Sequence, residues 1–117
     1  MKENLLVDLS SRFAVDIVNL CNNIKEGKKV NAIVNQLMRS GTSIGANIYE
    51  GNYASSKADF INKFQIALKE CYETDYWLTL FYKTEVITED EYKKKYSLCS
   101  KIRTLLTASL KTAKSKK

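Results

Sequence analysis

The chain has 117 residues, a net charge of +6, 44% hydrophobic and 27% charged residues, four glycines, and neither proline nor histidine. This length and composition are typical of one soluble globular domain, and the scarcity of turn residues excludes an all-β domain and favours long helices. The absence of histidine removes the commonest member of catalytic triads and zinc sites.

No apolar run approaches the length that crosses a bilayer, and acidic residues stand near the N-terminus where a signal peptide needs an apolar core. We therefore expect a cytoplasmic protein that does not bind membranes. The three cysteines, Cys21, Cys71 and Cys99, lie far apart and lack the C-x-x-C spacing of metal or redox sites. We expect them to be buried, reduced thiols.

Residues 4–25 are predicted to form the first helix, because apolar residues recur there at steps of three and four. The repeat consists of Leu6, Leu9, Phe13, Ile17, Leu20 and Ile24. We expect the helix to end at Gly27, because glycine readily adopts the left-handed conformation of a helix C-terminus. Lys28 and Lys29 follow, and their charge complements the negative end of the helix dipole.

Residues 31–50 are predicted to form the second helix, with a polar stripe on one side and an apolar seam on the other. The stripe consists of Gln36, Arg39, Ser43, Asn47 and Glu50. The seam includes Gly41 and Gly45, which cost about 1 kcal/mol each relative to alanine inside a helix. Close packing of a neighbouring helix against the two glycines would offset this cost, and a hinge or a ligand-approach point is the alternative.

The polar stripe is open to three interpretations: a surface face, a hydrogen-bond network between helices, or a binding site. Serine and asparagine weaken helix interiors and are unusual on a plain solvent face, so they favour a contact. The candidate partners of Arg39 are the carboxylates Glu70, Glu73 and Asp75, and such a pair would fix how two helices align. The stripe lacks a nucleophile, a second acid and a metal cluster, so we expect no enzyme, no cofactor and no small-molecule substrate.

Residues 56–85 are predicted to form the third helix, because Ser56 and Asp59 have the spacing of a helix N-cap. This helix is apolar on two sides, which is more apolar surface than one small bundle needs. The second side consists of Ile66, Trp77, Leu80 and Phe81. We expect these residues to contact another subunit.

Residues 89–113 are predicted to form the fourth helix, with Thr88 and Glu91 as its capping box and a frayed basic tail at residues 114–117. Four helices with short connections favour antiparallel neighbours. The expected fold is therefore all-α, a single up-down-up-down four-helix bundle covering residues 1–117.

The positive charge is concentrated at the end of the chain. Residues 93–117 contain nine lysines or arginines and no acid, whereas residues 1–92 have a net charge of −3. Four lysines share one side of the fourth helix, opposite its apolar seam: Lys93, Lys94, Lys101 and Lys111. This basic ridge either binds nucleic-acid phosphates or is a solvated face that aids solubility.

The second and third helices resemble a known family. The run from residue 36 to residue 51 contains the pattern R-S-x-x-S-I-x-x-N-I-x-E-G. This pattern, with further matches at residues 56–78, is similar to the proteins encoded by intervening sequences in bacterial 23S ribosomal RNA genes. The resemblance implies a four-helix bundle that assembles as a ring-like homopentamer. The chain also resembles the accessory variability determinant of diversity-generating retroelements, a relative whose positive surface engages nucleic acid and a reverse transcriptase.

Three hypotheses follow from the sequence. The first, which we favour, is a non-enzymatic, homo-oligomeric interaction or scaffold protein. The second is a nucleic-acid-binding accessory protein that uses the basic fourth helix. The third is an enzyme of unknown class, which needs a solvent-open cleft where Arg39, Asn47 and a carboxylate converge.

Overall fold

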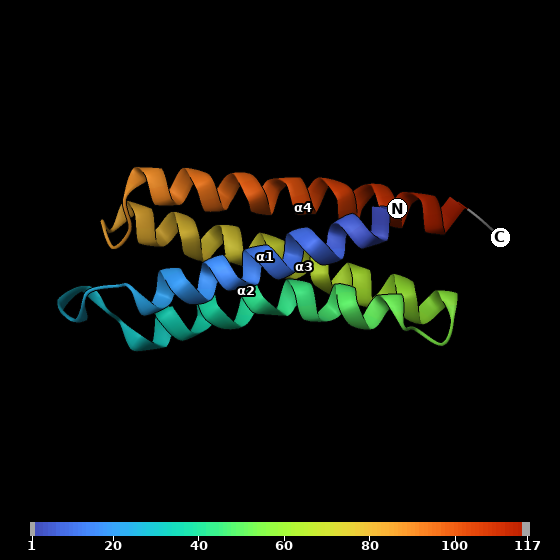
Figure 1. Ribbon diagram of the computed structural model, residues 1–117, viewed down its shortest axis with the longest axis horizontal. Helices are drawn as coiled ribbons and strands as arrows, with labels where there is room; N and C mark the ends of the chain where they lie inside the picture. The colour runs from blue at the N-terminus through green and yellow to red at the C-terminus, as the bar shows by residue number, and fades with distance from the viewer. Residues whose placement is uncertain (1, 116–117) are drawn as a thin grey trace.

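The computed structural model describes the backbone of residues 2–115 and the side chains of residues 5–115. The chain forms α1 (Lys2–Asn22), the short 3₁₀ helix η1 (Glu26–Lys28), α2 (Asn31–Asn52), α3 (Lys57–Lys83) and α4 (Glu89–Ser115). Each long helix runs antiparallel to the next (Figure 1), and α1 also contacts α4, so the four helices form a closed square. The predicted all-α, up-down-up-down bundle is confirmed.

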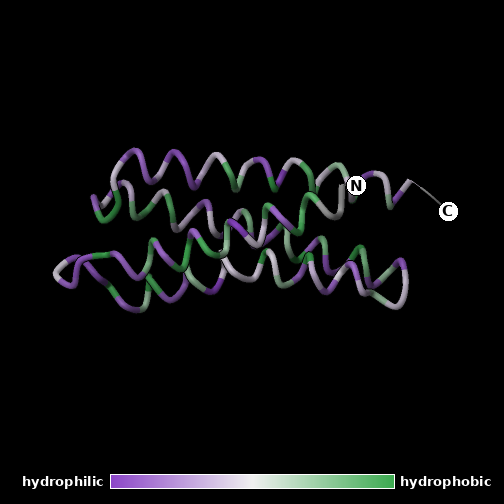
Figure 2. The backbone as a smooth tube through the Cα atoms, viewed as in Figure 1, coloured by the Kyte–Doolittle hydropathy of each residue, from purple (hydrophilic) through white to green (hydrophobic). Residues whose placement is uncertain are grey.

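The core lies along the axis of the bundle and contains the apolar seams of all four helices. Hydrophobic residues recur at short intervals along each helix (Figure 2). The largest fully buried side chains include Leu6, Phe13, Ile17, Leu37, Ile44, Ile48, Phe64, Leu78, Ile102 and Leu106. Phe81 belongs to this core, with only 2% of its surface exposed, so its predicted place in a subunit interface is wrong.

The first helix ends earlier than predicted, at Asn22 rather than at residue 25. Ile24 then turns into the core, and η1 closes the connection through the hydrogen bonds Lys28 N to Lys25 O and Lys29 N to Glu26 O. Within the described backbone no glycine has a positive φ, so the predicted left-handed Gly27 is wrong. A 3₁₀ turn reverses the chain here without a left-handed residue.

The end of α3 supplies the left-handed residue instead. Glu85 has φ 62°, and the backbone N–H of Val86 donates to the carbonyl of Phe81. This is the hydrogen-bond pattern of a Schellman C-cap, which ends α3 at Lys83, two residues before the prediction.

Both predicted N-caps are present. The hydroxyl of Ser56 accepts from Asp59 N, and Thr88 and Glu91 bond each other's backbone N–H groups. At the other ends, α2 continues to Asn52 and α4 to Ser115, so residues 114–115 of the expected frayed tail are helical. The remaining tail residues lie outside the described part.

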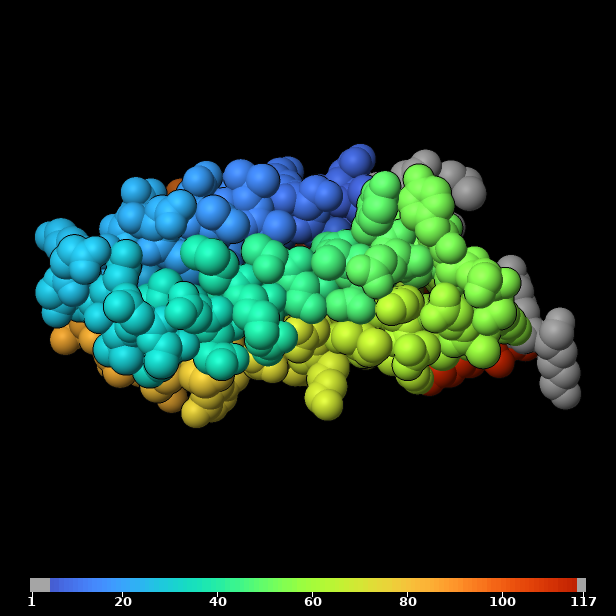
Figure 3. Space-filling view, turned by 90° about the horizontal axis from the view of Figure 1, so that it is seen from below, coloured from blue at the N-terminus to red at the C-terminus, as the bar shows by residue number. Residues whose placement is uncertain are grey.

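The two glycines of α2 admit a neighbouring helix, which is α1. A Cβ atom at Gly41 would lie 2.9 Å from the Ile17 side chain, and one at Gly45 would lie 3.3 Å from the backbone oxygen of Ser10. The packing interpretation of these glycines therefore holds, and the helices α1 and α2 lie side by side (Figure 3).

Within residues 2–115, none of the helices combines the length and the hydropathy that a membrane span needs.

Candidate functional site

The polar stripe of α2 meets α3 through Arg39. Its Nη1 lies 2.7 Å from Glu70 Oε2, and its Nη2 donates to Glu73, which also accepts from the Trp77 indole at 3.1 Å. The Trp77 hydrogen bond holds the pKa of Glu73 below its usual value, and Arg39 acts in the same direction. Two of the three predicted partners of Arg39 are therefore present.

The remaining stripe residues form separate contacts. The Asn47 amide donates to the Ser43 carbonyl at 2.9 Å and to the Ser43 hydroxyl at 3.0 Å, both within α2. Glu50 forms an ion pair with Lys63 of α3 at 3.1 Å. Arg39 and Asn47 thus do not converge on a shared ligand position, and the stripe aligns α2 with α3 at two places along the helices.

Asp75 has a different partner from the one considered in the sequence. It forms an ion pair with Arg103 of α4, whose guanidinium also donates to Ser100 and lies 5.2 Å from the centre of the Tyr72 ring. Burial raises the pKa of Asp75, and Arg103 opposes this shift. Within residues 5–115, Asp75 Oδ1 has no hydrogen-bond partner.

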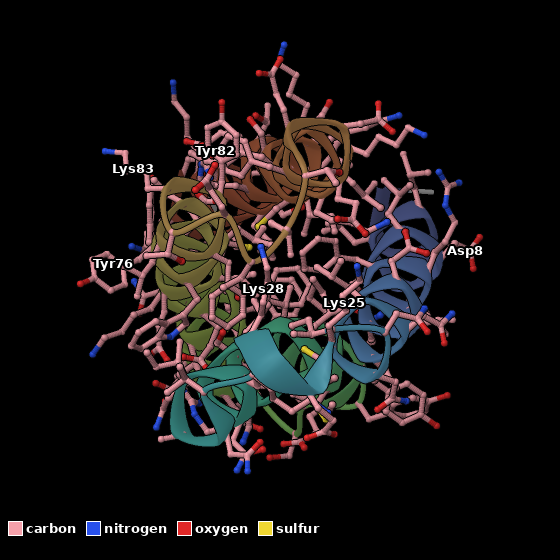
Figure 4. All side chains as sticks on the ribbon, turned by 90° about the vertical axis from the view of Figure 1, so that its left-hand side faces the viewer. Asp8, Lys25, Lys28, Tyr76, Tyr82 and Lys83 are labelled. Atoms are coloured by element: carbon pink, nitrogen blue, oxygen red, sulfur yellow. The ribbon has the colours of Figure 1, made fainter. Side chains whose placement is uncertain are left out.

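The predicted subunit-contact patch of α3 is only partly available. Ile66 is 37% exposed, while Trp77 and Leu80 are half-buried. Leu80 lines a groove of about 360 Å³ at the end of the bundle, together with Val30, Ile33 and Val86. Tyr76 points away from α3 into solvent (Figure 4), and its ring contacts that of Trp77 edge to face. The accessible part of the patch is thus aromatic and aliphatic and lacks Phe81.

The four lysines of the basic ridge have different surroundings. Lys93 pairs with Glu89 at 2.8 Å and Lys94 pairs with Asp90 at 3.1 Å, each one helical turn away. Lys101 and Lys111 are exposed, and within residues 5–115 neither forms an ion pair. The charge of the basic ridge is therefore partly neutralised at Lys93 and Lys94, near the N-terminus of α4.

The ridge borders a groove between α1 and α4 that the sequence did not predict. The groove has a volume of about 690 Å³, and its charged lining consists of Arg12, Asp16, Lys93, Lys94, Lys95 and Lys101. Five of these six residues are basic. Arg12 was missed because its position on α1 gives no sign of which helix lies beside it.

A model of the 23S rRNA-intervening sequence protein family matches residues 2–108 of the chain. The chain belongs to this family. A solved structure of a protein of unknown function from the S23 ribosomal protein family of Bacteroides thetaiotaomicron is 48% identical to it. That similarity covers 95% of this chain and 99% of the other, with a TM-score of 0.91. A comparison with curated proteins gave no match.

In this member of the family, the residues of the pattern R-S-x-x-S-I-x-x-N-I-x-E-G have structural contacts. Arg39 and Glu50 pair with α3, Asn47 bonds Ser43, and Ile44 and Ile48 are fully buried in the core. The pattern therefore contains residues that fix how α2 packs in the bundle.

The three thiols are free and buried, as predicted. Burial raises the pKa of Cys21 to about 11, and hydrogen bonding to Cys71 together with burial raises the pKa of Cys99. Thiols of this kind are poor nucleophiles at neutral pH. Within the described residues, no group of three or more cysteine or carboxylate side chains is placed to hold a metal ion.

Proposed function

We propose that this chain is a non-enzymatic, homo-oligomeric helical-bundle protein that serves as an interaction or scaffold module. The family resemblance suggests a ring of five copies. The cytoplasm is the expected compartment.

The supporting observation is the division of the surface between two kinds of side chain. Within residues 5–115, the large apolar side chains that remain exposed lie on α1, α2, α3 and the two residues that flank α2: Leu5, Val15, Val30, Tyr49, Tyr53, Ile66, Tyr72 and Tyr76. Helix α4 contributes none of them and carries the basic ridge. Surfaces that are rich in aromatic residues and poor in charge are typical of protein interfaces.

Light scattering coupled to size-exclusion chromatography tests this proposal. We expect a mass well above the 13.4 kDa of one chain at micromolar concentration, and five times that value for a pentamer. An assembly held by apolar contacts keeps its mass in high salt, because salt screens charge pairs and strengthens apolar burial. A mass of one chain at micromolar concentration overturns the proposal.

A second candidate function is binding to a nucleic-acid backbone, and the groove between α1 and α4 favours it. Arg12 joins Lys94 and Lys101 there, so basic residues from two helices line one concave surface. Clustered arginine and lysine side chains neutralise phosphates, which gives affinity that depends strongly on salt.

Fluorescence anisotropy with labelled single-stranded RNA and DNA tests this second function. We expect affinity to fall steeply between 50 and 200 mM salt, and each of Arg12→Ala and Lys101→Ala to reduce the slope of log affinity against log salt by roughly 0.7. Lys93→Ala and Lys94→Ala act less, because Glu89 and Asp90 already pair with these lysines. Lys69→Ala on the exposed side of α3 is the control. Binding that is insensitive to salt, or absent at low salt, excludes this function.

A further inference from the structure

The central part of one lateral side of the bundle carries no charge. It follows the line where α1 meets α2, defined by Ser10 against Gly45, Ile17 against Gly41, and Cys21 against Val34. Residues that stand one helical step outside this line form what we call the neutral face. The neutral face consists of Ser11, Ala14, Val15, Val18 and Asn22 of α1 and Asn31, Asn35, Met38, Thr42, Ala46 and Tyr49 of α2.

All eleven residues of the neutral face are exposed or half-buried, yet none carries a charge. Val15 and Tyr49 are each 58% exposed. The charged residues of α1 and α2 are turned elsewhere: Arg12 and Asp16 line the groove toward α4, and Arg39 pairs with α3. Asp8 lies beside Tyr49 at one end of the face, where both residues line the same hollow, and Lys25 follows the end of α1 at the other. Both residues are labelled in Figure 4.

The other three lateral sides formed by the described residues all carry charges. The α2–α3 side has Arg39 with Glu73, the α3–α4 side has Asp75 with Arg103, and the α1–α4 side has the basic groove. A solvent-exposed face of eleven residues with no charge is unusual in a chain whose residues are 27% charged. Depletion of charge is the composition found at the centre of protein interfaces.

The neutral face is formed by closely packed helices, and one of its polar groups keeps a hydrogen bond within the protein. The Thr42 hydroxyl donates to the Met38 carbonyl at 2.7 Å, so it keeps a hydrogen bond when water leaves. Gly41 and Gly45 bring α1 close to α2, and most side chains on the face are small. The two helices lie side by side (Figure 3). Because their side chains on this face are mostly small, another helix can pack closely against them.

We infer that the neutral face is the surface on which a second copy of this chain packs in the assembly. The inference rests on the proposed self-association and assigns a place to it. Copies with a net charge of +6 repel one another. The neutral face itself buries no charge, whichever side of the next copy in the ring packs on it.

The charge distribution favours a second copy over a foreign partner. The bundle measures 21 by 19 Å across, and α4 with its lysines does not contact α2. Repulsion from these lysines is screened over about 8 Å at physiological salt, which is less than the width of the bundle. An acidic partner would instead select the basic groove. Eleven residues are fewer than the roughly 20 to 30 that each side of a standard interface contributes, so they form its centre and polar neighbours form its rim.

Charge placed on the neutral face tests the inference. In Val15→Glu and Asn35→Glu, a carboxylate stands at an exposed position on α1 or α2, where the folded monomer tolerates it. We expect each variant to raise the dissociation constant of the assembly by roughly a hundredfold, since a buried unpaired charge is strongly unfavourable. Thr104→Glu on the exposed side of α4 makes the same change in net charge and is the matched control, with the wild-type mass expected.

Sedimentation velocity gives the mass of each variant, and circular dichroism checks that its helices melt as in the wild type. If the folded Val15→Glu and Asn35→Glu proteins keep the wild-type mass, the neutral face is not the interface, although the proposed self-association stands. A wild-type protein that sediments as one chain overturns both. Loss of assembly in Thr104→Glu as well would show that net charge, not the neutral face, controls association.

Discussion

Helix α3 is tied to each of its neighbours by one arginine, and the two ion pairs differ in burial. Arg39 of α2 has 51% of its side chain exposed and reaches Glu70 and Glu73. Arg103 of α4 has 19% exposed and reaches Asp75, which has 13% exposed. An arginine–carboxylate ion pair therefore lies at the rim of the α2–α3 contact and inside the α3–α4 contact.

The two sites shift their carboxylates in opposite directions. At the rim, hydrogen bonds from Trp77 and Arg39 lower the pKa of Glu73 because water still solvates the charged form. Inside, desolvation outweighs the arginine and raises the pKa of Asp75. An ion pair fixes the arrangement of helices in both places, and the loss of either arginine leaves a largely buried carboxylate, Glu70 or Asp75, without its partner.

Removing the buried arginine has the largest expected effect. Arg103→Met should lower the free energy of unfolding by about 4 kcal/mol, because Asp75 is left charged and buried. Urea denaturation measures this change. The double variant Asp75→Leu with Arg103→Met should recover most of the loss, since no charge is then buried. A single variant as stable as the wild type would mean that Asp75 is well solvated.

The uncharged contact between Gly41 and Ile17 shows how large the effect of disturbing apolar packing is beside the loss of an ion pair. Gly41→Leu should destabilise by about 3 kcal/mol, because even its Cβ atom would stand 2.9 Å from the buried Ile17. Gly27→Leu is the control, since a Cβ there meets nothing within 4 Å. Thermal unfolding separates the two. A Gly41→Leu protein more stable than the wild type would exclude a close contact between α1 and α2.

Removing the rim arginine should cost less than either change. Arg39→Met should lower the free energy of unfolding by about 2 kcal/mol. Half of the Arg39 side chain is solvated and Glu73 keeps its bond to Trp77, but Glu70, with 10% of its side chain exposed, loses its partner. The same urea series measures it. A loss equal to that of Arg103→Met would remove the distinction between the rim pair and the buried pair.

The smallest expected effect is the dependence on pH. Because the pKa of Glu73 is lowered on folding, its contribution is complete above its unfolded value of 4.5 and is lost as pH falls through the folded value. Asp75 has the opposite sign, so its contribution falls as pH rises from 3.8 through its raised folded value.

The contribution of Glu73 is measured by comparing the free energies of unfolding of Glu73→Gln and the wild type between pH 3 and pH 7. We expect the two proteins to differ by a few tenths of a kcal/mol at pH 7 after solvent screening, and to converge in acid. Carbon NMR of the carboxyl groups measures the pKa of Asp75, which we expect above 3.8. A folded pKa of Asp75 below that value would contradict its desolvation.

Residue spacing and side-chain chemistry predicted the elements and most local contacts. The three-four repeats gave four helices and their seams, the N-cap patterns at Ser56 and Thr88 gave two helix starts, and the chemistry of Arg39 pointed to Glu70 and Glu73. Each of these depends on residues within one helix or on one strong pairing preference, which are readable from spacing.

Packing between the helices determines which of their sides meet. In the folded bundle Phe81 is buried, Asp75 forms an ion pair with Arg103, and Arg12 lies beside the lysines of α4. Periodicity places a residue around its own helix axis but does not give the rotation of that helix against its neighbours. Packing sets that rotation, as where Gly41 meets Ile17, and the neutral face appears only once α1 and α2 are locked together.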